Sequence, residues 1–246
     1  MILSYRHDFV FIKGVKVAGT SIETALASIC GPEDIVTPIT PVDEAERLKM
    51  GTRPRNYARD AGVERAYLKG IETADATSLA TLRRPQTPFF NHMALSEVAI
   101  LEPRVTGMRV IVCERDPYAK VISLANMVAR ATDYKRGLAM KADFSELRSV
   151  AGELVNSGKM RRVLNIDLYR NADGAVDVEL LRYEHLHADF AELATRLDAA
   201  DLELPHLKRG LMSNELKPTD VFEPAQIDAI NDLFAVEFET FGYARI

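Results

Sequence analysis

The sequence predicts an α/β fold, in which a parallel β-sheet is flanked by helices on both faces. Two strand-to-helix units support this prediction. In the first, the apolar run 9–12 precedes a helical pattern that starts at Thr20, and in the second the apolar run 108–113 precedes a helix from Pro117. Short connections between such units are typical of parallel sheets. The 246 residues are enough for one large domain of this kind, so we expect a single domain over residues 1–246.

The first strand-to-helix unit carries a glycine-rich loop between its strand and its helix. Apolar residues recur at helical spacing from Ile22 to Ile29, and the pattern stops at Gly31-Pro32. Gly14 and Gly19 precede the helix, and glycines at this place let backbone N–H groups converge on a phosphate. The sequence therefore predicts a P-loop-like fold with an anion site at this loop.

The loop has the glycine spacing of a Walker A motif without the lysine of that motif. Thr20 follows Gly19 where a Walker A loop requires lysine, and the lysine inside the loop is Lys16. An ATPase altered in this way would lose the side chain that reaches the outer phosphates. A P-loop kinase or NTPase is therefore the weaker of the nucleotide-binding interpretations.

The second strand-to-helix unit offers another candidate anion site. Arg115 lies at the carboxyl end of the predicted strand, where its guanidinium can form a two-pronged contact with phosphate. Ser123 lies eight residues further on, close to the same face of the helix that starts at Pro117. The structural alternative for Arg115 is an ion pair with Asp116 or Glu114.

The rest of the chain gives weaker signals. Residues 32–87 contain five prolines and read as an irregular insertion, with short helices around 43–49 and 71–82, that forms a lid or a substrate wall. His92 precedes a helix over 95–101. Further predicted features are a hairpin or turn at 171–174 between the apolar runs 164–169 and 176–181, a helical stripe over 190–197 and one amphipathic helix over 224–241.

Net charge, cysteine content and hydropathy limit the ligands and the cellular compartment that the sequence suggests. A net charge of −5 gives no general attraction to nucleic acid or to an anionic membrane, so an anionic ligand must be held by a local positive site. Cys30 and Cys113 lie in apolar runs and read as buried thiols in a reducing compartment, without metal-ligand spacing. No apolar run approaches the roughly 20 residues of a membrane span. We expect a cytoplasmic protein with no metal site.

Four stretches of the chain, roughly residues 8–29, 88–129, 176–200 and 225–243, resemble the PAPS-dependent sulfotransferases, and most closely their carbohydrate-type branch. Two blocks within these stretches carry most of the candidate site residues. The first block is the stretch Lys16-Val17-Ala18-Gly19-Thr20-Ser21 after its apolar strand, which resembles the 5′-phosphosulfate loop of that family. The resemblance implies that Lys16 approaches the bridging oxygen of the phosphosulfate and that the loop from Val17 to Ser21 holds the 5′-phosphate. Val15 departs from the proline that the family usually has before this lysine, which concerns the rigidity of the loop.

The second block is Arg115-Asp116-Pro117 followed by Lys120 and Ser123. Arg115 and Ser123 resemble the pair that holds the 3′-phosphate of PAPS in the family, while Lys120 stands where the family commonly has arginine. His92 matches a histidine that the carbohydrate-type branch often carries, and its imidazole can take a proton from an acceptor hydroxyl. The basic turn Lys208-Arg209-Gly210 is either a solvated loop or a cover for the 3′-phosphate.

The resemblance implies an enzyme that moves a sulfuryl group from 3′-phosphoadenosine 5′-phosphosulfate (PAPS) to a hydroxyl of a glycan or small molecule. PAP would be the second product, and no metal is needed. Residues 32–87 would shape the acceptor site, with Phe89, Phe90, Tyr57 and Tyr67 as candidates for stacking. The alternatives are a P-loop kinase or NTPase, and a sulfotransferase-like nucleotide-binding protein without activity.

Overall fold

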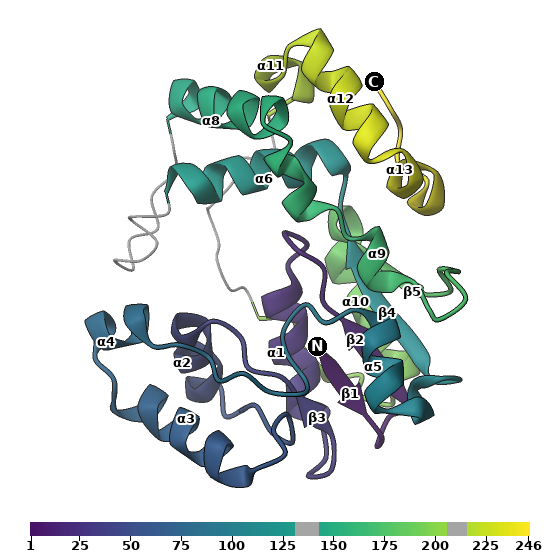
Figure 1. Cartoon of the computed structure of the whole chain (residues 1–246). Helices are drawn as coiled ribbons and strands as arrows, with labels where there is room; N and C mark the ends of the chain where they lie inside the picture. The colour runs from purple at the N-terminus through teal and green to yellow at the C-terminus, as the bar shows by residue number, and fades with distance from the viewer. Residues whose placement is uncertain (131–142, 206–215) are drawn as a thin grey trace. The chain divides into compact units, whose positions relative to one another are not determined.

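A computed structural model describes residues 1–130, 143–205 and 216–246 (Figure 1). The chain divides into two compact units. The first comprises Met1–Gly14, Ala18–Cys113 and Asp167–Pro205, and the second comprises Val15–Val17, Glu114–Ile166 and His206–Ile246.

The first unit contains a five-stranded sheet in the order β3-β1-β2-β4-β5. The strands span Ile2–Ser4 (β1), Phe9–Ile12 (β2), Ile35–Val36 (β3), Arg109–Glu114 (β4) and Glu179–Arg182 (β5). β2 runs parallel to β4, as the sequence predicts, but β1 is antiparallel to both β2 and β3. The sheet is therefore mixed, and the prediction of a parallel sheet was wrong for this edge. Only four residues join β1 to β2, and so short a connection can join antiparallel neighbours only.

The sheet is covered on both faces at β1 and β2. All four residues of β2 are fully buried, and successive side chains of a strand point to opposite faces. All three residues of β1 are buried as well. This pattern explains why β2 reads as a continuous apolar run and not as an alternating one.

Helices of the first unit follow the predicted pattern in part. α1 (Gly19–Ile29) and α5 (Leu95–Leu101) form where the sequence predicts them, and α10 (Leu186–Arg196) contains most of the predicted stripe over 190–197. The 3₁₀ turns of this unit are η1 (Pro103–Val105) and η3 (Tyr183–His185).

Residues 32–87 are more regular than predicted. They form β3 and three helices, α2 (Pro41–Lys49), α3 (Ala61–Thr73) and α4 (Ala76–Thr81), and both α3 and α4 contact α2 (Figure 1). The predicted helix over 43–49 is confirmed within α2. The prediction of one helix over 71–82 was wrong, because α3 ends at Thr73 and α4 begins at Ala76. The Asp75 side chain accepts a hydrogen bond from the Ser78 N–H and so caps the start of α4.

The second unit is helical. It contains α6 (Pro117–Ala129), α8 (Phe144–Asn156), η2 (Lys159–Val163), α11 (Pro218–Val221), α12 (Pro224–Leu233) and α13 (Ala235–Phe241). α6 packs along α8, and their buried apolar side chains form one core with those of α12 and α13. The predicted single helix over 224–241 is broken at Phe234, whose ψ of 15° leaves the helical range and separates α12 from α13.

Residues 164–169 do not form the predicted first strand of a hairpin. They carry the short helix α9 (Ile166–Tyr169), so the Asp173-Gly174 signal marks a turn and not a hairpin. Gly174 has a φ of 86°, and its N–H donates to the carbonyl of Asn171 at 3.1 Å.

Two further predictions concern the thiols and the membrane. Cys30 and Cys113 are both buried and neither forms a disulfide in the described chain, as the sequence predicts, and burial raises the pKa of Cys30 to about 12. In the described parts of the chain, no helix combines the length and the apolar character that a bilayer crossing requires.

Candidate functional site

The glycine loop that follows β2 ends at the N-terminus of α1. Ala18 has a left-handed backbone conformation with a φ of 58°. Its carbonyl accepts hydrogen bonds from the N–H groups of Ser21 at 3.0 Å and Ile22 at 3.3 Å, which starts the helix. Thr20 and Ser21 therefore lie in the first turn of an 11-residue helix, the end that favours an anion.

Gly19 is in close contact with the side chain of Lys13. A Cβ atom added at Gly19 would lie 2.6 Å from Cγ of Lys13 and 3.1 Å from its Cε. The Lys13 side chain passes Gly19 and ends on Glu23, where Nζ lies 2.7 Å from Oε2. Glycine is required at position 19 because the lysine stem occupies the space of a side chain.

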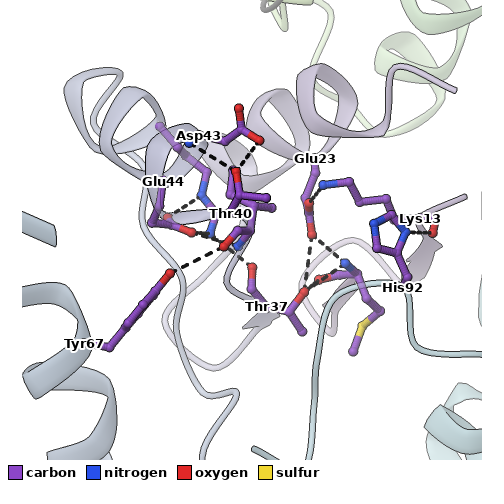
Figure 2. Close-up of polar contacts among 11 residues, drawn as sticks. Lys13, Glu23, Thr37, Thr40, Asp43, Glu44, Tyr67 and His92 are labelled. Carbon is purple, nitrogen blue, oxygen red and sulfur yellow. Dashed lines mark hydrogen bonds and ion pairs between the residues drawn. The ribbon is translucent and has the colours of Figure 1, made fainter. Parts of the chain in front are cut away.

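His92 lies against the beginning of the same loop, although 79 residues separate it from Lys13. Its Nδ1 is 2.9 Å from the carbonyl oxygen of Lys13 (Figure 2). Since a carbonyl oxygen can only accept a hydrogen bond, Nδ1 must carry a proton. Burial, followed by the positive charge of Lys13, lowers the pKa of His92 to about 4.

These two facts fix the protonation state of the imidazole. With a pKa of about 4 the His92 ring is neutral at pH 7, and the proton on Nδ1 leaves the lone pair on Nε2. A neutral imidazole held in one tautomer has the Nε2 lone pair that a general base requires, and a pKa of about 4 makes it a weaker base than an ordinary histidine.

A buried polar network runs from Glu23 into residues 32–87 (Figure 2). Oε1 of Glu23 lies 3.4 Å from the Thr37 hydroxyl, and Nη2 of Arg47 donates to the Thr37 carbonyl at 3.1 Å. Arg47 also pairs with Glu44 at 2.8 Å. Burial alone would raise the pKa of Glu23, but the charges of Lys13, of the Met1 ammonium and of Arg47 lower it to about 2. Glu23 is therefore an ionised anchor for Lys13.

The second unit holds the residues around Lys16. The side-chain amide of Asn165 clasps the backbone of Val15: its Oδ1 accepts from the Val15 N–H at 2.8 Å, and its Nδ2 donates to the Val15 carbonyl at 3.2 Å. Proline at position 15 would remove the first of these bonds. A side-chain clasp therefore restrains the residue before Lys16.

Asn165 also belongs to a buried charged cluster. Its Nδ2 lies 3.2 Å from Oε2 of Glu114, and Lys120 pairs with Glu114 at 2.9 Å and with Glu237. Oε1 of Glu237 accepts the backbone N–H of Asn165 at 2.5 Å. All four side chains are fully buried. Burial raises the pKa of Glu114 to about 7, with Lys120 opposing the shift and Glu237 adding to it.

This cluster gives Lys120 a structural role. The resemblance stated from the sequence would make Lys120 a positive charge near the candidate 3′-phosphate site. Both carboxylates of the cluster contact its ammonium, and the side chain is fully buried. The charge of Lys120 therefore compensates Glu114 and Glu237.

Arg115 and Ser123 lie in the second unit with Lys16. Arg115 follows β4, and its backbone N–H donates to its neighbour Glu114 at 2.8 Å. Ser123 lies on α6, and Arg115 and Ser123 are 5% and 8% exposed. Charge-assisted hydrogen bonds between a phosphate and such shielded groups would be stronger than on an open surface.

Three of the sequence-predicted site residues have a strained backbone. Lys16, Ala18 and His92 have φ values of 66°, 58° and 60°, and the other non-glycine residues with positive φ in the described chain are Asp8, Asn56 and Asp198. A left-handed conformation costs an L-residue roughly 1–2 kcal/mol, and such strain clusters at functional sites.

Other predicted residues have different outcomes. Tyr57 and Tyr67 are buried, so they do not offer a face for stacking, whereas Phe90 is 42% exposed. Lys208, Arg209 and Gly210 lie outside the described residues. Sequence reasoning missed Lys13, Glu114 and Asn165; the one available signal was a polar residue inside or directly after an apolar run. Among the described residues, no group of three or more His, Cys, Asp or Glu side chains is arranged to hold a metal ion.

Comparisons of the chain with protein-family models, with curated proteins and with solved structures found no match.

Proposed function

We propose that this protein is a PAPS-dependent sulfotransferase that transfers a sulfuryl group to a hydroxyl of a small-molecule or carbohydrate acceptor. The observation that carries the proposal is the contact of His92 with Lys13. His92, which the resemblance names as the base, lies 2.9 Å from the carbonyl oxygen of Lys13, the residue directly before the glycine loop, and both residues belong to one compact unit. The histidine is moreover in the protonation state that a general base requires.

The donor would be held through its phosphates. Lys16, Val17, Ala18, Gly19, Thr20 and Ser21 are the residues for the 5′-phosphosulfate, and Arg115 and Ser123 are those for the 3′-phosphate. Support for the first group comes from the left-handed Lys16 and Ala18, and from the two hydroxyls in the first turn of α1. Such loop amides and helix N-termini suit a phosphate. Arginine at the end of β4 suits the second phosphate by charge and shape.

For sulfuryl transfer the protein must hold donor and acceptor in line and stabilise the charge that develops on the leaving phosphate. The donor supplies a sulfuryl group activated by its link to phosphate. Nε2 of His92 takes the proton of the acceptor hydroxyl while that oxygen forms a bond to sulfur. The bond from sulfur to the bridging phosphate oxygen breaks at the same time, and Lys16 stabilises the negative charge that this oxygen gains. The products are the sulfate ester and PAP, and the proton resides on His92.

The direct test is Lys16→Ala in an assay with radiolabelled PAPS and a panel of hydroxylated acceptors. We expect the substitution to lower turnover by about 10²–10³-fold, the range that loss of one charge-stabilising donor causes. Lys69→Ala, which removes an exposed lysine from α3, is the control and should leave turnover unchanged. Turnover of Lys16→Ala at the wild-type rate would contradict the mechanism. A wild-type protein that binds PAP but sulfates no acceptor would instead be a nucleotide-binding protein without activity.

A further inference from the structure

A pocket in the first unit lies beside the segment that carries His92. Its volume is about 550 Å³, within the range of small-molecule sites. One wall comes from residues 38–41 and another from 82–87, and Phe90 and Asn91 complete the lining. Asn91 directly precedes His92 in the sequence, although the His92 side chain is not itself part of the lining.

The charge of this pocket has one sign. Among its lining residues, Arg83 and Arg84 are charged, and none is acidic. Neither arginine has a carboxylate partner in the described chain, in contrast to Arg104, which pairs with Glu102 at 2.8 Å. Arg84 is also close enough to Tyr67 to lower the pKa of its phenol, against the larger raising effect of burial. Arg83 and Arg84 follow one another in the sequence and both line the pocket, and an arginine without a carboxylate partner can form a two-pronged contact with a carboxylate, sulfate or phosphate.

The remaining lining provides an apolar face and hydrogen-bonding groups. Pro38, Pro41 and the exposed ring of Phe90 contribute apolar surface. Thr40 and Gln86 add a hydroxyl and an amide to the lining. The pocket thus combines apolar surface, hydrogen-bonding groups and a positive wall.

We infer that this pocket receives the sulfate acceptor and that the acceptor is a hydroxylated small molecule carrying an oxyanion, which Arg83 and Arg84 bind. The inference rests on the proposed sulfotransferase function for the reaction, but the binding itself does not depend on it. It gives residues 32–87 a specific task, because Thr40 and the 82–87 segment come from this part of the chain.

Matched probes test the charge preference without nucleotide. Binding is measured by calorimetry for p-nitrophenyl β-D-glucuronide against p-nitrophenyl β-D-glucoside, and for glucose 6-sulfate and glucose 6-phosphate against glucose. We expect wild-type protein to bind the anionic member at least tenfold more tightly in one or more pairs. The pair that responds tells whether a carboxylate, a sulfate or a phosphate is preferred. Equal binding of both members, or binding of neither in every pair, would overturn the inference.

Variants locate the effect. The double variant Arg83→Ala/Arg84→Ala should lose at least tenfold in affinity for the preferred anion, with the neutral partner changed less than twofold. Arg161→Ala/Arg162→Ala removes two adjacent exposed arginines from η2 and is the control. An equal loss in the control, or no loss in the pocket variant, would refute the assignment. Titration with PAP keeps the two proposals apart. If the wild-type protein does not bind PAP, the donor proposal is wrong. If it binds PAP but shows no preference for the anionic probes, only the acceptor-pocket inference is wrong.

Discussion

Lys13 joins three parts of the first unit through three different groups. Its carbonyl accepts from His92, its ammonium pairs with Glu23, and its Cγ lies where a side chain at position 19 would be. The lysine therefore fixes the histidine and the start of α1 with one side chain and one peptide unit. Gly19 serves this packing as well as any phosphate contact, so its substitution has a consequence for stability that does not depend on the ligand.

Gly19→Ala should destabilise the protein by about 1–3 kcal/mol, the usual cost of forcing an extra methyl group into a packed site. The neighbouring Cγ of Lys13 is in the middle of its side chain and cannot move without disturbing the contact with Glu23. Gly70→Ala is the matched control: a methyl group there meets Leu82 at 3.7 Å, and alanine favours the helix by up to about 1 kcal/mol. Urea unfolding measures both variants, and equal free energies of unfolding for the two would contradict the packing argument.

His92→Asn should abolish acceptor activation while preserving the local fold. Asparagine tolerates a positive φ better than most residues, and its amide can still donate to the Lys13 carbonyl, but it has no basic nitrogen. We expect kcat/KM to fall by about 10²-fold or more. His185→Asn, at an exposed histidine, should have no effect.

The pH dependence of the wild type gives a second test of the same residue. Because the pKa of His92 is lowered to about 4, the base stays unprotonated down to low pH. The kcat/KM should therefore be flat between pH 5.5 and 7.5 and fall only as the pH approaches about 4. A profile that loses half its value near the ordinary histidine pKa of about 6.5 would show that His92 is not the base, or that it is not shielded as described.

At the scale of elements, the loop residue Val15 is held by a residue from a distant segment. Asn165 bonds both the N–H and the carbonyl of Val15, and its own backbone N–H is fixed by Glu237 of α13. The strained residue Lys16 follows directly. This clasp is the device that restrains the second-unit part of the loop.

Asn165→Ala should therefore reduce stability by more than about 2 kcal/mol, because it leaves the part-buried Val15 N–H without its bond and removes a donor from the buried Glu114. Asn156→Ala, at an exposed position of α8, is expected to change the free energy of unfolding by less than about 0.5 kcal/mol. Chemical unfolding of both variants checks this. A loss at Asn165 no larger than that at Asn156 would mean that the clasp does not hold the loop.

The elements that the sequence predicted well have local signals. β2 and β4 are apolar runs, α1 ends at Ile29 just before Gly31-Pro32, and α6 starts with Pro117 after the capping Asp116. β1 and β3, with three and two residues, are too short for a pattern. They make the sheet mixed. The break at Phe234 and the helix α3 depend on packing and on caps that periodicity does not reveal.

The residues of the candidate site also fall into those that local sequence signals reveal and those that only the fold reveals. The sequence named Lys16, His92, Arg115 and Ser123 from motifs, and the contact of His92 with the loop follows from the fold. It could not show Asn165 on Val15, a contact across 150 residues, or the pairing of Lys120 with Glu237 across 117. Such pairings are set by the burial of polar groups that need partners, and no local spacing encodes them.

At the scale of the whole molecule, a net charge of −5 opposes the approach of a highly charged anion such as PAP. Binding must then come from local groups, and Lys16 and Arg115 are the proposed ones. Lys120 does not add to them, since two buried carboxylates surround its ammonium. Recognition of the 3′-phosphate is therefore the property that separates the sulfotransferase proposal from a kinase or NTPase.

Titration calorimetry with PAP, AMP and the ATP–magnesium complex tests this property most directly. The proposed site binds phosphate at both ends of the ribose, so PAP should bind at least about tenfold more tightly than AMP, a difference of about 1.4 kcal/mol. PAP should also bind more tightly than ATP–magnesium. Binding of ATP–magnesium in preference to PAP, or equal affinity for PAP and AMP, would contradict the account.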